Sequence, residues 1–522
     1  MRFTGLLLSV LAAIGPVAAH RSPQHVGKKL PRLAEERVAR SQPSHPIAAR
    51  AKHQSPYLNK NSSKFVVNGT SIPDVDWDIG ESYAGLLPIS DDPKEERQLY
   101  FWFFPSDNVL AGDEITIWLN GGPGCSSLEG LLQENGPFLW QYGTFKPVKN
   151  PYTWVNLTNM VWVEQPVGTG FSQGKPNATS EEDVADQFLG FFKNFVDTFN
   201  LHGRKIYIAG ESYAGYYVPY IANAMLDKED TKYYNLQSIM IFDPSLSSDA
   251  IQEQIPATPF VDYWSHLLSL NESFVDHLHS LHKSCGYEDY IKENLVYPPK
   301  GRFPEPPSTD GECDLWNAVF EAASDINPCF DVYQVATTCP SLWDVLGFPG
   351  SFDYLPAGAK IYFDRPEVQK AINAPKTNWA ECTDTAVFVG GTDNSEPSSY
   401  SVIPSVIEKT NRTIIGHGLL DFILLSQGTR LVIQNMTWNG AQGFTAEPSD
   451  DFYVPYHPQA SLSTLAGAGT VGKFRTERGL TYAEVNLSGH MIPQYFPTAA
   501  YRLVEYLLGR IDTLSENATQ PL

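Results

Sequence analysis

The chain has 522 residues, 42% hydrophobic and 18% charged, a globular composition that excludes a disordered polymer. Its formal net charge of -22 at pH 7 argues against binding to nucleic acid or to an anionic membrane surface. No zinc-binding pair, P-loop or dinucleotide-binding motif is evident, so we expect no metal and no cofactor.

The N-terminal residues indicate export. Residues 1–19 combine Arg2, an apolar run and small residues at the end, which predicts a secretory signal peptide. Residues 20–60 are basic and poor in large apolar side chains, as expected for a pro-segment or mobile arm; a solvated tail fits equally well. No later apolar run reaches membrane-spanning length, so we expect no membrane anchor and a secreted protein, with a vacuole as the second choice.

Export changes what the cysteines and asparagines imply. The six cysteines are even in number and allow three disulfides. Sequons predict a glycosylated surface at Asn61, Asn68, Asn156, Asn177, Asn271, Asn411, Asn435 and Asn517. A further sequon at Asn486 is doubtful as a glycan site, because it falls in a predicted strand.

The first half of the chain alternates strands and helices. Residues 83–105 read as a hairpin, and residues 114–119 (EITIWL) as a buried strand that enters a glycine-rich turn, NGGPGCSS. Phosphate binding by these glycines is discounted, since no lysine follows as a P-loop requires. Residues 160–164 form the next predicted strand, and residues 180–199 a helix with an S-x-x-D capping start.

A strand at 205–209, a sharp turn and a helix at 216–226 follow, and residues 238–242 continue the sheet. The turn Gly210-Glu211-Ser212-Tyr213-Ala214 matches the G-x-S-x-G nucleophile elbow of α/β-hydrolases except that Ala214 replaces the last glycine. An ordinary turn with an N-cap serine is the alternative. The element order predicts an α/β-hydrolase with a mostly parallel central sheet flanked by helices.

The pattern changes at residues 249–358, where short helical pieces, a proline-rich patch and four of the six cysteines gather. We expect a disulfide-stapled helical cap insertion there, with the core formed by residues 61–248 and 359–522. Residues 413–416 and 482–487 are the last predicted core strands, and residues 498–508 the closing helix.

A serine nucleophile of this fold needs an acid and then a histidine later in the chain. His490 follows the last predicted strand in a glycine-containing loop, whereas His417 breaks the order and His457 reads as a surface residue. Asp421 follows the strand ending at Gly416 and is preferred over the other acid candidates, Asp393, Asp450 and Asp451.

Four motifs, WLNGGPGCSSLEG, EQPVGTGFS, GESYAGYYVP and GHMIP, together resemble the serine carboxypeptidases, the carboxypeptidase Y-like family. The resemblance covers roughly residues 83–509. The chain departs from the family at Glu164, where many members have Asp, at Tyr216, often His, and at Leu419, which replaces the first Asp of G-D-x-D.

The resemblance implies the catalytic set Ser212, Asp421 and His490, with oxyanion donors at the N–H groups of Gly122 and Tyr213. It implies that the substrate's terminal carboxylate binds at Asn120, Gly121, Glu134, Glu211 and Trp118. Glutamic acids bind a carboxylate only if at least one of them is protonated. The resemblance also implies a Cys125–Cys382 disulfide; Cys285, Cys313, Cys329 and Cys339 then pair among themselves with open connectivity.

The resulting hypothesis is a serine carboxypeptidase that releases C-terminal amino acids from peptides and proteins at acidic pH through an acyl-enzyme on Ser212. An acyltransferase or esterase on the same scaffold is the alternative. A catalytically inactive binding protein is disfavoured by the complete Ser, Asp and His set. The sequence leaves the side-chain preference and the oligomeric state open.

Overall fold

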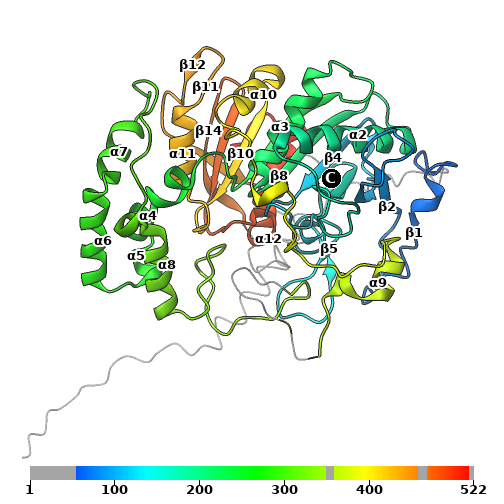
Figure 1. Cartoon of the computed structure of the whole chain (residues 1–522), viewed down its shortest axis with the longest axis horizontal. Helices are drawn as coiled ribbons and strands as arrows, with labels where there is room; N and C mark the ends of the chain where they lie inside the picture. Colours follow the sequence, from blue (N-terminus) through cyan, green and yellow to red (C-terminus); the bar gives the residue numbers. More distant parts are fainter. Residues whose placement is uncertain (1–54, 348–354, 356–357, 457–466, 517–522) are drawn as a thin grey trace, which may run out of the picture. The chain divides into compact units, whose positions relative to one another are not determined.

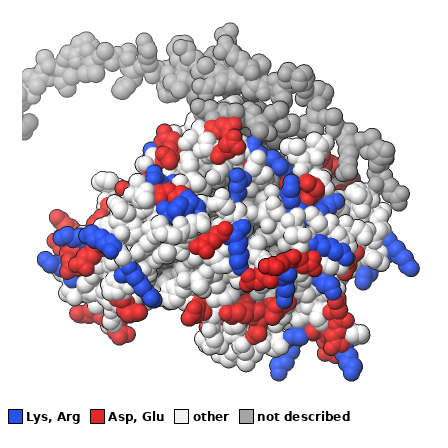
Figure 2. All heavy atoms as spheres, turned by 90° about the horizontal axis from the view of Figure 1, so that it is seen from above, with Lys and Arg blue, Asp and Glu red and all other residues white. Residues whose placement is uncertain are grey.

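The computed structural model describes residues 55–347, 355, 358–456 and 467–516 (Figure 1). The predicted signal peptide at 1–19, most of the 20–60 segment, His457 and the sequon at Asn517 lie outside the described residues. Among the described residues, no helix is long and apolar enough to cross a membrane. On the face shown in Figure 2, Lys and Arg side chains are interspersed with Asp and Glu.

The core of the fold is an 11-stranded sheet in the order β1-β2-β3-β7-β4-β8-β9-β10-β15-β14-β13. Its central strands pair in parallel: β4 (Glu114–Leu119), β7 (Met160–Glu164), β8 (Lys205–Glu211), β9 (Leu236–Phe242), β10 (Thr413–Gly418) and β15 (Leu480–Val485). Antiparallel strands extend both edges: β1 (Val66–Val67), β2 (Ser82–Pro88), β3 (Gln98–Phe104), β13 (Asp450–Val454) and β14 (Gly469–Glu477). The sheet is therefore parallel at its centre and antiparallel at its edges.

The central strands are apolar along their length because helices cover both faces of the sheet. On one face, α2 (Glu181–Phe199) and α3 (Ala214–Asp227) bury their side chains against it. Phe188, Phe192, Phe195 and Phe199 of α2 recur at helical spacing and are fully or almost fully buried there. On the other face lie α12 (Ile492–Tyr495) and α13 (Pro497–Leu507). Further helices are α9 (Pro366–Ala371), α10 (Val402–Thr410) and α11 (Ser426–Asn435).

Several local predictions are corrected by the structure. Ser180 makes no side-chain cap for α2; instead Asp183 accepts hydrogen bonds from the N–H (2.8 Å) and hydroxyl (2.7 Å) of Thr179. The helix after Ser212 begins at Ala214 rather than at Tyr216. The last core strand ends at Val485, so Asn486 lies outside it and is exposed.

The sequons differ in exposure. Of the eight asparagines predicted to carry glycans, six are exposed: Asn61, Asn68, Asn156, Asn177, Asn271 and Asn411. Asn435 is half-buried, and its side-chain oxygen accepts a hydrogen bond from the N–H of Phe303 at 3.0 Å. Glycosylation of Asn435 would therefore compete with a tertiary contact.

A group of helices lies to one side of the sheet in Figure 1. It contains α4 (Ala257–Tyr263), α5 (Ser265–Leu268), α6 (Glu272–Ser284), α7 (Tyr287–Asn294) and α8 (Leu315–Ile326), after the π-helical turn η6 (Ala250–Gln254). Disulfides join Cys285 to Cys313 and Cys329 to Cys339. Two tryptophans of this group donate to the loop after β10: Trp264 to the carbonyl of Leu419 (2.8 Å) and Trp316 to that of Phe422 (2.6 Å). The helical segment thus supports the loop that carries Asp421.

At Gly215 the helix α3 packs closely against the chain that follows β9. A Cβ at this position would lie 2.1 Å from the backbone oxygen of Ser245. Replacing a helical glycine by alanine ordinarily stabilises by about 0.5–1 kcal/mol. Here we expect Gly215→Ala to lower the free energy of unfolding by about 1–3 kcal/mol, measured by denaturant titration, because the neighbour is backbone.

Gly112→Ala is the matched control. Its Cβ would meet only the oxygen of Val109 at 3.7 Å, and its φ of -59° suits alanine. If Gly215→Ala had the same free energy of unfolding as Gly112→Ala, the close contact between α3 and the backbone of Ser245 would be contradicted.

Candidate active site

Ser212 stands at the turn between β8 and α3 with a φ of 61°. A serine in this left-handed region costs about 1–3 kcal/mol, so the surrounding contacts must impose it. Its N–H donates to the carbonyl of Phe242, and its own carbonyl accepts from the N–H groups of Gly215 and Ser245, all at 2.9 Å. The strained turn points to a nucleophile elbow.

Small residues allow this turn to lie against the sheet. A Cβ on Gly210 would lie 2.5 Å from the carbonyl oxygen of Leu119 and 2.8 Å from the Cβ of Ala214. Ala214 is fully buried at the place of the usual last glycine. Alanine therefore fits at this position because Gly210 leaves room for its methyl group.

His490 and Asp421 are in direct contact. His490 Nδ1 lies 2.7 Å from Asp421 Oδ2, and both residues are at most 2% exposed. The other oxygen of Asp421 accepts from the N–H groups of Ile423 (2.8 Å) and Leu424 (3.2 Å). The carboxylate therefore fixes the imidazole so that Nε2 is left for proton transfer.

Ser212 and His490 line the same cavity, of about 380 Å³. Within the described part of the chain, His490 Nε2 is buried without a hydrogen-bond partner, and no hydrogen bond joins it to the Ser212 hydroxyl. Such bonds often lengthen without substrate and tighten in the reacting complex. The geometry thus joins the predicted acid and base directly and places the predicted nucleophile in their cavity.

The other sequence candidates have different surroundings. His417 Nε2 lies 2.8 Å from the carbonyl of Leu424, and burial lowers its pKa. Asp393 accepts a hydrogen bond from the hydroxyl of Tyr213 at 2.6 Å, while Asp450 and Asp451 are exposed on β13. Among the described residues, none of them forms a hydrogen bond or an ion pair with His490.

Sequence reasoning missed Asp243, which is fully buried at the end of β9. It accepts a hydrogen bond from the N–H of Gly418 at 2.7 Å. Burial, followed by repulsion from Asp421, raises its pKa well above the ordinary value. Asp243, His417 and Asp421 offer ligand atoms within 4.8 Å of one another, but Asp421 is already engaged by His490. We therefore read this group as a hydrogen-bonded support of Asp421.

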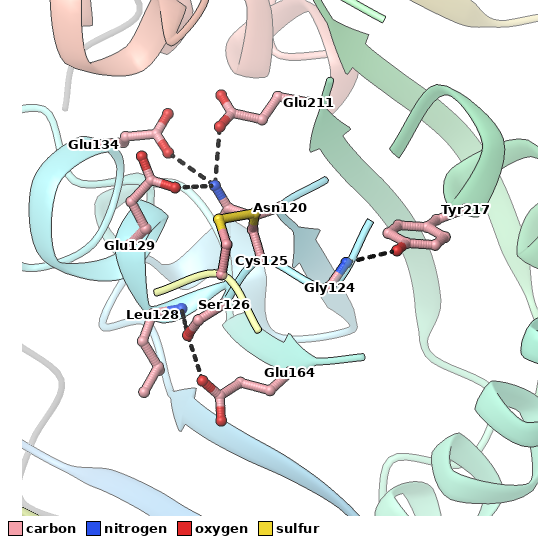
Figure 3. The surroundings of a disulfide bond; sticks show 11 residues. Asn120, Gly124, Cys125, Ser126, Leu128, Glu129, Glu134, Glu164, Glu211 and Tyr217 are labelled. Carbon is pink, nitrogen blue, oxygen red and sulfur yellow. Dashed lines mark hydrogen bonds between the residues drawn. A yellow bond between two sulfur atoms is a disulfide. The ribbon is translucent and has the colours of Figure 1, made fainter. Parts of the chain in front are cut away.

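The predicted oxyanion donors also face the cavity, since Gly122 and Tyr213 both line it. Within the described residues neither backbone N–H has an acceptor. A Cβ on Gly121 would lie 2.4 Å from the nitrogen of Tyr213, so only glycine permits this approach of the two loops. The Cys125–Cys382 disulfide and a hydrogen bond from Gly124 N–H to the Tyr217 hydroxyl (3.2 Å) hold the glycine loop (Figure 3).

Three glutamic acids converge on the amide of Asn120 beside this loop (Figure 3). Asn120 Nδ2 lies 3.2 Å from Glu129, 3.4 Å from Glu134 and 2.9 Å from Glu211. These acids also form a group with ligand atoms within 4.8 Å of one another. The amide group, itself a donor, lies where the carboxyl groups converge, so hydrogen bonding rather than metal binding accounts for the arrangement.

Trp118 lies beside the predicted carboxylate site. It is fully buried and does not line the cavity; its ring N–H donates to the side-chain oxygen of Asn120 at 2.7 Å. Trp118 therefore orients the side chain of Asn120 from behind. Glu134 is also set back, 1% exposed at the end of the π-helical turn η4 (Gly130–Glu134).

Burial controls the protonation of these acids. It raises the pKa of Glu134 to about 7, although hydrogen bonds from Glu211 and Asn120 lower it. Burial, with repulsion from Glu134 and Glu129, raises the pKa of Glu211 well above its ordinary value. Both pKa values are raised, and two carboxylates this close cannot both be ionised without strong repulsion, so at least one of the two acids holds a proton in acid.

Acidic side chains dominate the cavity wall. Glu129, Glu211, Asp249, Glu253 and Glu381 line it, and among the described residues no lysine or arginine does. Sequence reasoning singled out only Glu211 of these five. Glu129 lies inside the motif GCSSLEG, and its place in this motif could have identified it as a site residue. Glu381 is far from the motif in sequence and is brought to the cavity by the Cys125–Cys382 disulfide.

The fold, the strained serine and the Asp–His contact define a serine hydrolase of the α/β-hydrolase class. A solved structure of a prohormone-processing carboxypeptidase from Saccharomyces cerevisiae has this fold: it matches with a TM-score of 0.68 and 24% identity, covering 87% of this chain and 98% of that one.

Sequence comparison gives the family. The family model described as serine carboxypeptidase matches residues 73–510. A probable serine carboxypeptidase of Arthroderma benhamiae is 60% identical over 99% of this chain and 100% of its own length. The serine-type carboxypeptidase F of Aspergillus niger is 49% identical over 88% of this chain and 89% of its own. The chain belongs to the serine carboxypeptidase family and is a hydrolase of that class.

The raised pKa values predict a stability that falls as the pH rises. An acid whose pKa is higher in the folded than in the unfolded protein binds more protons when the protein is folded. Its contribution to the free energy of unfolding is full below the unfolded pKa and is lost as the pH rises through the folded pKa. For Glu134 this window runs from 4.5 to about 7. We expect the free energy of unfolding to fall between pH 5 and pH 8, by up to about 1.4 kcal/mol per pH unit for each such acid.

Denaturant titration at each pH measures this slope, and Glu134→Gln should make it shallower. Glu182→Gln, at an exposed position on α2, should leave it unchanged. Equal slopes in all three proteins would contradict the raised pKa of Glu134.

Proposed function

We propose that the protein releases the C-terminal amino acid from peptides through an acyl-enzyme on Ser212. The observation that carries this proposal is the cluster of Asn120 with buried glutamic acids, which lies in the same cavity as the serine and the histidine. The relatives named as carboxypeptidases support this activity over the esterase or acyltransferase alternative.

The proposed chemistry follows the geometry of the site. His490 Nε2 takes the proton of the Ser212 hydroxyl as its oxygen attacks the carbonyl of the last peptide bond. The N–H groups of Gly122 and Tyr213 bind the oxyanion that forms. His490 then protonates the leaving amino group, and it afterwards activates the water that hydrolyses the acyl-enzyme. Asp421 orients the imidazole and stabilises its charged form throughout.

Recognition of the terminal carboxylate separates an exopeptidase from a general hydrolase. We assign it to Asn120, whose amide donates, to the backbone of Gly121, and to the proton held between Glu211 and Glu134. With both acids ionised, the site would repel the substrate, since like charges that close strongly disfavour each other. Binding is therefore favoured at acidic pH.

The proposed setting is an oxidising, acidic one outside the cytoplasm. The predicted signal peptide, the three disulfides and the exposed sequons support secretion of a glycosylated protein. Secretion into the medium and delivery to a vacuole share these features. Substrates in either case are peptides with a free C-terminus.

The pH dependence of substrate binding tests the role of the glutamic acids. For a blocked dipeptide we expect KM to rise as the pH increases through about 7, where Glu134 ionises. In Glu134→Gln the rise should be shallower, because an amide donates a hydrogen bond at every pH. Steady-state kinetics from pH 4.5 to 8 measure KM for both proteins. A KM of the parent protein that stays constant over this range would contradict carboxylate binding by protonated glutamic acids.

The requirement for a free carboxylate is tested with a matched pair of substrates. A blocked dipeptide should be cleaved at least about 10–100-fold faster, in kcat/KM, than its C-terminal amide, as expected for loss of a hydrogen bond to a charged group. Ser212→Ala should cleave neither. Equal rates on the acid and the amide would instead indicate an esterase or endopeptidase.

A further inference from the structure

The acids of the cavity wall fall into two groups. Glu129 and Glu381 interact electrostatically with Glu134, so they lie toward the proposed carboxylate site. Asp249 and Glu253 lie toward Asp421, whose charge acts on Glu253. The terminal carboxylate and side chain of a peptide share one Cα atom. A substrate bound at Asn120 would therefore place its last side chain near Glu129 and Glu381.

Glu381 is held firmly in this position. It precedes Cys382, which is joined to Cys125, and its carbonyl accepts a hydrogen bond from the N–H of Ser126 at 2.7 Å. The residue is 5% exposed and lines the cavity, yet its Oε2 has no hydrogen-bond partner among the described residues. A buried carboxyl oxygen without a partner is costly, so a ligand that donates there is favoured.

The surroundings of Glu381 carry no compensating cation among the described residues that line the cavity. The titratable groups that interact with it are Glu129, Glu134, Asp344, Tyr142 and Tyr333. All of these are neutral or negative. A lysine or arginine side chain entering this end of the cavity would meet carboxyl groups on more than one side.

We propose that Glu381 and Glu129 select a lysine or arginine as the C-terminal residue of the substrate. The inference rests on the proposed function, because it takes the position of the leaving residue from the carboxylate site at Asn120. It goes beyond that function by naming the side chain that the site prefers.

The preference should depend on pH. Burial, then repulsion from Glu129, Asp344 and Glu134, raises the pKa of Glu381 well above its ordinary value. Burial, followed by repulsion from Glu134 and Asp344, does the same for Glu129. In acid the wall is therefore largely uncharged and also accepts apolar side chains. As the pH rises, or as a cation enters, the acids ionise and the preference for a basic side chain increases.

The experiment compares two blocked dipeptides with the same first residue, one ending in lysine and one in norleucine, its uncharged analogue. We expect the ratio of kcat/KM, lysine over norleucine, to exceed 1 and to increase from pH 4.5 to pH 7.5. Glu381→Gln should lower the ratio at pH 7.5 by about tenfold or more, the size of a lost hydrogen bond to a charged group. Glu129→Gln should lower it in the same direction.

Glu253→Gln is the matched control, the same change at the other end of the cavity, and it should leave the ratio as in the parent. Cleavage of the norleucine peptide with a ratio at or below 1 at every pH would overturn the inference while the proposed function stands. A ratio that Glu253→Gln lowers as much as Glu381→Gln would also overturn it. Release of neither amino acid would mean that the proposed function itself fails, and the inference with it.

Discussion

The sharing of protons among buried carboxyl groups at Asn120 is the constraint on which the rest of the site depends. Glu134 and Glu211 are 1% and 3% exposed, and Glu129 meets them at the same amide. Three negative charges so close together and so poorly solvated would oppose folding strongly. They coexist because burial keeps protons on them. In the proposed function, the same protons allow an acidic site to donate hydrogen bonds to a peptide's terminal anion.

The fold supplies this arrangement from parts distant in sequence. Neighbouring parallel strands β4 and β8 end side by side, so that Asn120, just beyond β4, meets Glu211, the last residue of β8. The turn after β8 raises Ser212 beside them, and the disulfide brings residue 382 against the glycine loop. Tryptophans of the helical segment hold the loop of Asp421 from the outside. The geometry of the candidate site therefore depends on the sheet, the disulfide and the helical segment together.

Local features of this site could be predicted from the sequence. The elbow at Ser212 is encoded in five adjacent residues, and the order of Asp421 and His490 follows from the strands that precede them. Features that depend on the third dimension could not be predicted. Glu381 lies near Glu129 only because a disulfide spans 257 residues, and Asp243 meets Gly418 only because β9 pairs with β10. The hydrogen bond from Trp118 to the side chain of Asn120 also depends on how the two side chains meet in space. The pairing of the four remaining cysteines likewise required coordinates.

Proton uptake on binding examines the central claim most directly. Isothermal titration calorimetry of Ser212→Ala with a blocked dipeptide, repeated in buffers of different ionisation enthalpy, counts the protons that accompany binding. At a pH above 7 we expect net proton uptake with the free acid and none with the C-terminal amide, which should bind more weakly. Binding of both ligands with equal affinity and without proton uptake would contradict recognition of the terminal carboxylate by protonated glutamic acids.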